Sequence, residues 1–132
     1  MTALLTLERG LQLNRLCGLI LDSSEIIHDV AIIDKKGRVA ENMMRDDRVT
    51  KNLTDQKREM LYMECALQLS MVRDFDDEFG VAKYTHSTRE KVSIFSFLLD
   101  DYSIIVLSEP DTNPKVFSQH VIGIIELFEE LP

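Results

Sequence analysis

Residues 54–80, TDQKREMLYMECALQLSMVRDFDDEFG, decide how this chain folds, because they form its longest predicted helix. Thr54 is a typical N-cap, Asp55 suits the positive end of the helix dipole, and Gly80 is typical of a helix stop. At the helical repeat the apolar residues fall on two roughly opposite stripes. One stripe contains Leu61, Cys65, Leu69, Val72 and Phe79, and the other contains Met60, Met63, Leu67 and Met71. A helix on a sheet buries one stripe, so the second must be covered by another helix, a loop or a second chain.

The sequence before this helix predicts another helix and a β-hairpin. From Thr2 to about Leu21, apolar residues recur at helical spacings of three and four, at Leu4, Leu7, Leu11, Leu16, Leu19 and Ile20. Ile26–Ile33 and Arg38–Met44 predict two strands joined by the tight turn 34–37, in which Gly37 can adopt a positive φ. A polar connection, residues 45–52, then leads to the long helix.

The sequence after the long helix predicts three strands and a last helix. The strands are Val81–Ser87, Val92–Leu99 and Tyr102–Ser108, with short turns at 89–90 and 100–101. Asn113 as N-cap and Pro114 at the first helical position begin the helix, whose inner face contains Phe117, Val121, Ile124 and Phe128. The order is α-β-β-α-β-β-β-α, and we expect one α+β domain over residues 1–132, with no internal repeat or linker.

The charge of the chain limits its partners. Fifteen Lys and Arg against 23 Asp and Glu give a net charge of −8, which argues against general nucleic-acid binding. Basic residues nevertheless gather within residues 35–51. Such a run is usually a solvated hairpin and loop, and the alternative is a weak docking patch for an acidic partner at Arg45, Arg48 and Lys51.

Cysteines and apolar runs favour a cytoplasmic protein. Cys17 and Cys65 lie in helical apolar patterns without metal or redox spacing, so we expect two buried thiols in a reducing compartment. Glu8 and Arg9 interrupt the first apolar run, which excludes a secretory core there. No uncharged apolar run approaches the roughly 18 residues that a membrane span needs, so no membrane association is expected.

The sequence predicts no catalytic or cofactor site. Its five glycines form neither dinucleotide nor P-loop motifs, and no serine lies in a nucleophile elbow. His28, His86 and His120 lack a second ligand at metal-binding spacing. Pairs of aspartates at 46–47, 76–77 and 100–101 fall at turns or helix ends, where their carboxylates diverge. We therefore expect a protein that is not an enzyme and has no cofactor or metal. An enzyme with a dispersed active site is the alternative, and no motif supports it.

The hairpin Ile33–Val39 (IDKKGRV) and the block Glu59–Met63 (EMLYM), in this element order, resemble the roadblock/LC7 fold of the profilin-like and longin-like group. More narrowly, Arg58–Leu69, Lys91–Leu98 and Val106–Pro110 (VLSEP) resemble a set of small uncharacterised proteins from ammonia-oxidising archaea. The resemblance covers about residues 10–128, and its motifs are structural, not catalytic.

This resemblance implies a five-stranded antiparallel sheet in the order 2-1-5-4-3, with the long helix on one face and the terminal helices on the other. Roadblock-type domains form homodimers or heterodimers through their third strands and second helices. Here that interface would use Met60, Met63, Leu67, Met71, Val81, Lys83 and Thr85. Equally, a methionine stripe at helical spacing is often plain core. The implied function is a dimeric interaction module that scaffolds or regulates a partner, for which related domains suggest a small GTPase.

A second hypothesis is a cytosolic small-molecule sensor, because profilin-like sheets resemble those of the PAS and GAF domains. A sensor needs a cavity with convergent polar groups. Tyr84, His86 and Ser93, on or beside the predicted sheet, are the candidate ligand contacts.

Overall fold

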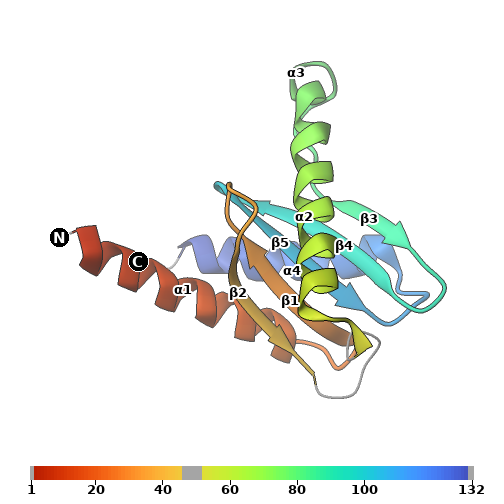
Figure 1. Ribbon diagram of the computed structural model, residues 1–132. Coiled ribbons are helices and arrows are strands. Elements are labelled where there is room, and N and C mark those ends of the chain that lie inside the picture. Colours follow the sequence, from red (N-terminus) through yellow and green to blue (C-terminus); the bar gives the residue numbers. More distant parts are fainter. Residues whose placement is uncertain (1, 46–51, 131–132) are drawn as a thin grey trace.

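The computed structural model describes residues 2–45 and 52–130. Its elements follow the predicted order (Figure 1). They are α1 (Thr2–Asp22), β1 (Ile27–Ile33), β2 (Val39–Met44), α2 (Asp55–Val72), the 3-10 turn η2 (Arg73–Phe75), α3 (Asp76–Phe79), β3 (Thr85–Thr88), β4 (Ser93–Leu99), β5 (Tyr102–Ser108) and α4 (Pro114–Glu130).

The strands form one antiparallel sheet in the order β2-β1-β5-β4-β3, which confirms the predicted fold class. β5 is the central strand, with β1 and β4 on either side, and β1 and β5 are buried along nearly their whole length. β2 and β3 are the edge strands. Two of the three hairpins of the described sheet are set by local turn chemistry. Gly37 has φ +82° in the β1–β2 turn, where the Asp34 side chain accepts hydrogen bonds from the backbone of Lys36 and Arg38, and Asp100 has φ +53° in the β4–β5 turn.

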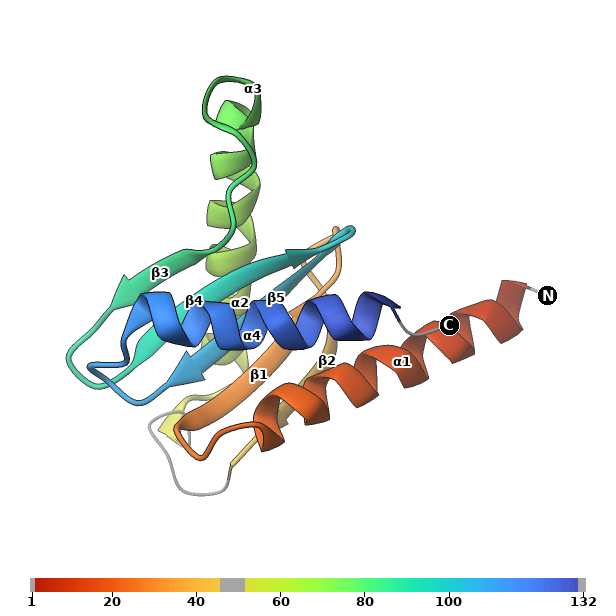
Figure 2. The ribbon, with the colours of Figure 1, turned by 180° about the vertical axis from the view of Figure 1, so that it is seen from behind.

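Helices cover both faces of the sheet, as the resemblance implies (Figures 1 and 2). On one face, α1 and α4 pack over inward side chains of β1, β4 and β5, such as Val30, Phe95 and Val106. On the other face α2 packs through Tyr62 and Cys65 over a smaller cluster. The buried residues of α2 extend from Arg58 to Leu69, and the end of the helix projects beyond the sheet with α3 (Figure 1).

Two predicted element boundaries were wrong. The long helix does not run unbroken to Gly80, because α2 ends at Val72 and a 3-10 turn precedes the short α3. Gly80 does end α3, with φ +84°. The third strand begins at Thr85 and not at Val81, so Val81–Tyr84 lie outside the sheet ladder. The projecting helix carries the chain away from the sheet before it returns to pair with β4.

The inner face of α1 also differs from its prediction. Leu13, Leu16, Cys17 and Ile20 are buried, together with Leu21. Leu11 and Leu19 are instead exposed to 64% and 46%. The leucine pattern of this helix has more apolar positions than the sheet can cover, so spacing alone did not select the buried ones.

Candidate functional site

A buried carboxylate fixes α2 to the sheet. Asp29, in the middle of β1, is fully buried, and its Oδ2 accepts hydrogen bonds from Tyr62 Oη at 2.7 Å and Arg58 Nη1 at 2.9 Å. Its Oδ1 accepts a hydrogen bond from Asn42 Nδ2 at 2.7 Å. Burial raises the pKa of Asp29, while these partners act in the opposite direction. The network joins β1, β2 and the first half of α2, so it positions the rest of that helix.

The second stripe of α2 is exposed over its whole length. Met60, Met63, Leu67 and Met71 are exposed to 54%, 55%, 62% and 60%. The described part of the chain therefore does not cover these side chains, although large apolar groups aligned on one face are unusual on a monomer surface. Thr54 caps the helix, as predicted, by accepting a hydrogen bond from the Lys57 backbone at 3.1 Å.

The stripe divides between two sides of the helix. Met63 lies beside the β1–β2 turn. If Gly37 carried a Cβ atom, that atom would lie 3.5 Å from Met63 Cε. Leu67 and Met71 border a groove of about 420 Å³ between α2 and β3, whose other side includes Thr85. Of the seven predicted interface residues, Leu67, Met71 and Thr85 therefore lie along one groove. Leu61, Gln68 and Ser87 also line it, and the sequence did not single them out for this surface.

The groove leads to an apolar hollow on the projecting end of the helix. Phe75 and Phe79 stack with ring centroids 5.9 Å apart and are exposed to 56% and 83%. Together with Met71 and Val81 they line a hollow of about 550 Å³. Val81 thus extends the apolar surface, but from the end of the helix and not from a strand. Sequence reasoning grouped Phe79 on one stripe with Cys65 and Leu69, which are buried, whereas Phe79 is exposed because the chain leaves the sheet before this residue.

The outer edge of β3 has no partner strand within residues 2–45 and 52–130. Thr85 and Ser87 oppose Ser96 and Ile94 of β4, and the Arg89 backbone donates to the Val92 carbonyl at 3.0 Å. Because antiparallel hydrogen bonds alternate along a strand, the backbone groups between these positions point to the free edge. A free edge beside exposed apolar side chains is a template for pairing with another chain.

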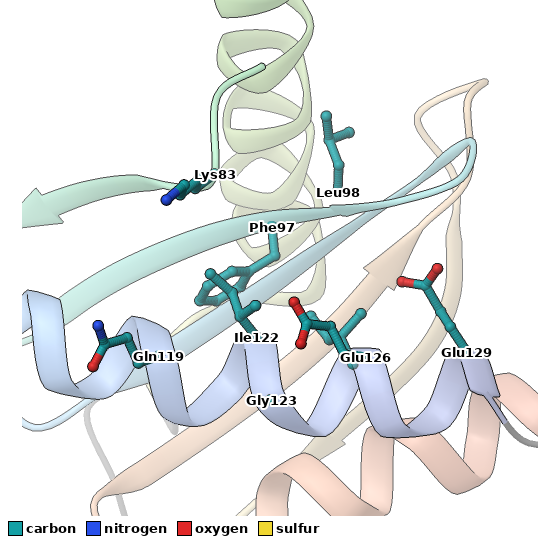
Figure 3. Close-up of a pocket in the computed structure, with 9 residues that line it drawn as sticks. Lys83, Phe97, Leu98, Gln119, Ile122, Gly123, Glu126 and Glu129 are labelled. Carbon is teal, nitrogen blue, oxygen red and sulfur yellow. The ribbon is translucent and has the colours of Figure 1, made fainter. Parts of the chain in front are cut away.

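Lys83 lies on the opposite face of the sheet from the groove. It is exposed and lines a second groove, between β4 and α4 (Figure 3). The structure therefore separates Lys83 from the other predicted interface residues.

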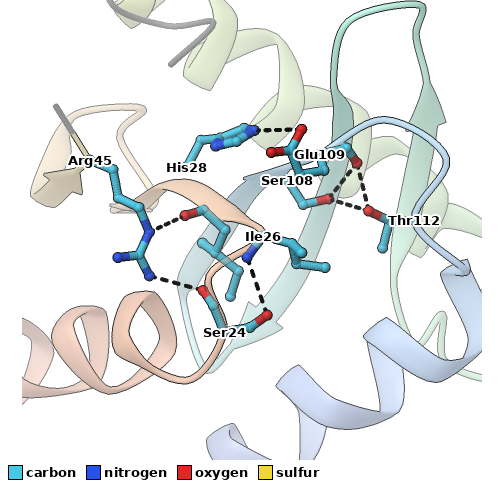
Figure 4. Close-up of polar contacts among 8 residues, drawn as sticks. Ser24, Ile26, His28, Arg45, Ser108, Glu109 and Thr112 are labelled. Atoms are coloured by element: carbon cyan, nitrogen blue, oxygen red, sulfur yellow. Dashed lines mark hydrogen bonds and ion pairs between the residues drawn. The ribbon is translucent and has the colours of Figure 1, made fainter. Parts of the chain in front are cut away.

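Arg45 does not belong to a basic docking patch, because its guanidinium bonds to the backbone of its own chain. Its guanidinium donates to the backbone carbonyls of Leu21, Ile27 at 2.6 Å and Ser24 at 2.9 Å, joining the end of α1 to β1 (Figure 4). Arg45 therefore has a structural role here. Arg48 and Lys51 lie outside the described residues, so the patch at those two positions stays a prediction.

Cys17, Cys65 and His28 are buried and take part in the packing of the protein. Cys17 and Cys65 are buried free thiols, as predicted, and burial raises the pKa of Cys17 to about 12. His28 is buried with Nε2 3.6 Å from Glu109 Oε2 (Figure 4). Residues 2–45 and 52–130 contain no cluster of three or more His, Cys, Asp or Glu that could hold a metal ion. No helix among these residues is long and apolar enough to cross a membrane.

The three candidate ligand contacts of the sensor hypothesis are part of the sheet's packing. His86 stacks on Phe95 with ring centroids 4.3 Å apart, and Tyr84 lies 6.2 Å from the same ring. Ser93 is buried in β4. The rings of Tyr84 and His86 thus cover a core phenylalanine instead of facing a cavity together.

A five-stranded antiparallel sheet in this order, with one helix on one face and two on the other, is the architecture of roadblock/LC7 domains. No protein-family model and no curated protein matches the sequence. Solved structures of low identity share the fold. A Roadblock/LC7 domain from Streptomyces avermitilis superposes with a TM-score of 0.67 and 10% identity, over 88% of this chain and 93% of that one.

Two further structures extend this comparison. MglB from Myxococcus xanthus superposes with a TM-score of 0.70 and 13% identity, over 92% of this chain and 89% of its own. A structure described as MglB with a tetrameric arrangement has a TM-score of 0.50 and 14% identity, over 92% and 90%. At these identities the comparisons establish the fold and leave function to be argued from this chain's own surface.

Proposed function

We propose that this protein is a non-enzymatic, dimeric interaction module that scaffolds or regulates a partner protein. The observation that carries the proposal is the groove between α2 and β3, which is bordered by the exposed apolar side chains Leu67 and Met71 and lies beside an unpaired sheet edge. A second copy that adds its own β3 to this edge would extend the sheet and bring its α2 against the groove. Both contacts are self-complementary, as a two-fold interface requires.

The energetic argument combines two effects. Burying side chains that are about 60% exposed removes apolar surface from water, and pairing of edge strands satisfies backbone groups that otherwise bond to water. The hollow formed by Phe75, Phe79 and Val81 continues the same surface and increases the area available for burial. The tetrameric arrangement in the name of one structure with this fold supports self-assembly as a property to test here.

The class of the regulated partner is a further part of the proposal. The resemblance to roadblock/LC7 domains favours a small GTPase as the class of partner. The acidic composition, the cysteine pattern and the interrupted apolar runs favour a cytoplasmic location without nucleic-acid or membrane binding. The narrower resemblance of Arg58–Leu69, Lys91–Leu98 and Val106–Pro110 favours kinship with the small proteins of ammonia-oxidising archaea. The dimer is proposed as a homodimer, with a paralogue as the alternative second chain.

The test is the mass in solution by size-exclusion chromatography with multi-angle light scattering across a range of concentrations. We expect twice the chain mass of 15.2 kDa, falling toward one chain mass on dilution. Thr88→Pro supplies a matched variant, because the Thr88 backbone points to the free edge and proline removes its donor. This variant should keep its fold and dimerise more weakly. A single chain mass at every concentration would contradict the proposal.

A further inference from the structure

The edge of β4 that faces β3 is only partly used. β3 pairs with Ser93–Ser96 of β4, and this pairing ends at Thr85. β4 continues through Leu99 and stays paired with β5 on its other side. The last residues of β4, Phe97–Leu99, therefore extend past the end of β3 and form a short open edge within the sheet.

Leu98 is the residue of this segment whose backbone points to the open side. Leu99 and Tyr102 flank a two-residue turn, so they exchange their backbone hydrogen bonds with each other. Hydrogen bonding alternates along β4, which directs the Leu98 N–H and C=O away from β5. Lys83 would be the next partner on the β3 side, but no hydrogen bond joins its backbone to Leu98 in the described part of the chain.

A groove of about 510 Å³ lies directly beside this open position, between β4 and α4. Phe97 and Ile122 supply apolar walls, and Gly123 leaves open space where other residues have a side chain (Figure 3). The groove is therefore shaped to take an apolar side chain from a segment that runs along the edge of β4.

The rim of the groove is acidic on the α4 side. Glu126 and Glu129 are exposed and lie one helical turn apart, while Lys83 lies across the groove (Figure 3). A cationic side chain beside the two carboxylates would form charge-assisted hydrogen bonds, whereas an acidic one would be repelled. The open backbone of Leu98, the apolar walls and the acidic rim together favour an extended segment with one apolar and one basic side chain.

We propose that this open edge of β4 binds an extended segment of a partner protein in which an apolar residue is followed, two residues later, by Lys or Arg. Side chains two apart lie on the same face of a strand, about 6.6 Å from each other. The apolar side chain packs between Phe97 and Ile122 over Gly123, and the basic one lies beside Glu126 and Glu129. The peptide backbone pairs with Leu98, which is recognition by strand addition.

This site is distinct from the proposed dimer interface. It lies on the α4 side of the sheet and on the inner side of β3, whereas the dimer groove lies on the α2 side. Peptide binding and dimerisation are therefore measured separately, and either result can fail without the other.

The first measurement is amide hydrogen exchange of the free protein by NMR. The Leu98 amide should exchange at least tenfold faster than the amides of Phe97 and Leu99, which bond to β5. Equal protection of all three amides would show that the chain itself closes this edge, for example through Lys83, and would overturn the proposal.

The second measurement is binding of synthetic peptides to the same protein. The probe is acetyl-Thr-Val-Thr-Lys-Thr-Lys-amide, and the controls replace both Lys by Glu or N-methylate the Thr between Val and Lys. The Lys probe should slow exchange at Leu98 and shift the Gly123 amide, with both controls binding at least tenfold more weakly. Equal binding of the Lys and Glu peptides, or no change at Leu98 with about 1 mM probe, overturns the proposal.

A charge-reversal variant completes the test. E126K with E129K changes two exposed side chains, so it should keep the fold and the oligomeric mass, and it should prefer the Glu peptide. Unchanged preference in this variant would show that the rim does not select the ligand and would overturn that assignment. Retention of the dimer alongside loss of peptide binding leaves the proposed function intact.

Discussion

Replacing Leu67 and Met71 with Asp together should convert the dimer into monomers without unfolding the chain. Both side chains are about 60% exposed in the single chain, so charged substitutes there remain solvated and cost little native stability. In the dimer the same positions would be enclosed by the second copy, and two aspartates would lose solvation without gaining a partner.

The expected magnitude follows from the area still available for burial. Full burial of a Leu or Met side chain contributes about 1.5–3 kcal/mol, so the exposed part of each contributes about 1–2 kcal/mol. Each residue occurs once in each copy, so four side chains contribute and the double variant loses about 4–8 kcal/mol of association free energy. At about 1.4 kcal/mol per factor of ten, the dissociation constant rises by at least about a thousandfold.

The assay is light scattering or sedimentation equilibrium over a dilution series, with circular dichroism to confirm the fold. Val116→Asp with Leu127→Asp is the matched control, because those side chains are exposed to 63% and 67% on α4, on the other face of the sheet. This control should keep the wild-type mass. A Leu67 and Met71 double variant that is folded and still dimeric, or a control that dissociates equally, would refute the interface assignment.

Other predictions concern the core and the turns. Tyr62→Phe removes one donor from buried Asp29 and should lower the free energy of unfolding by about 1–3 kcal/mol in urea titrations. Burial raises the Asp29 pKa above its unfolded value. The stabilising contribution of this group is therefore fully present below the ordinary carboxyl pKa range and is lost as pH rises through the raised pKa. Asp29→Asn should lack this pH-dependent component when the free energy of unfolding is measured at several pH values. The Cys17 thiol, with a pKa of about 12, should resist alkylation at pH 8 until the chain is unfolded, as mass spectrometry would show. Gly123→Ala should raise the melting temperature, with about 1 kcal/mol of added helix stability, whereas Gly37→Ala should lower it by forcing about 1–2 kcal/mol of strain at φ +82°.

Most of the element order could be predicted because its signals are local. Thr54 caps α2, Gly37 permits the first hairpin turn, and the side chain of Asn113 accepts a hydrogen bond from the Val116 backbone at 3.1 Å at the start of α4. These contacts join residues within four positions of each other. The second stripe of α2 could likewise be predicted, because helical spacing alone places its residues opposite the buried face.

The network around Asp29 could not be predicted in the same way. Arg58 and Tyr62 are 29 and 33 residues away from Asp29 in sequence, and polar side chains on a helix usually face solvent. A usable signal was present, since an aspartate inside the apolar run Ile27–Ile33 requires a buried partner. The exposure of Phe79 was hidden as well, because it depends on where α2 leaves the sheet and not on its own spacing.

The Asp29 network also has a consequence for how this chain diverges from its relatives. Losing Arg58 alone would leave the buried Asp29 carboxylate without its ion-pair partner, at a cost of about 3–5 kcal/mol, whereas joint replacement of the network by well-packed apolar residues is often neutral. Positions 29, 42, 58 and 62 should therefore change together or not at all. In an alignment of homologues these four positions would covary. That covariation would identify homologues even where overall sequence identity is as low as it is among the solved structures of this fold.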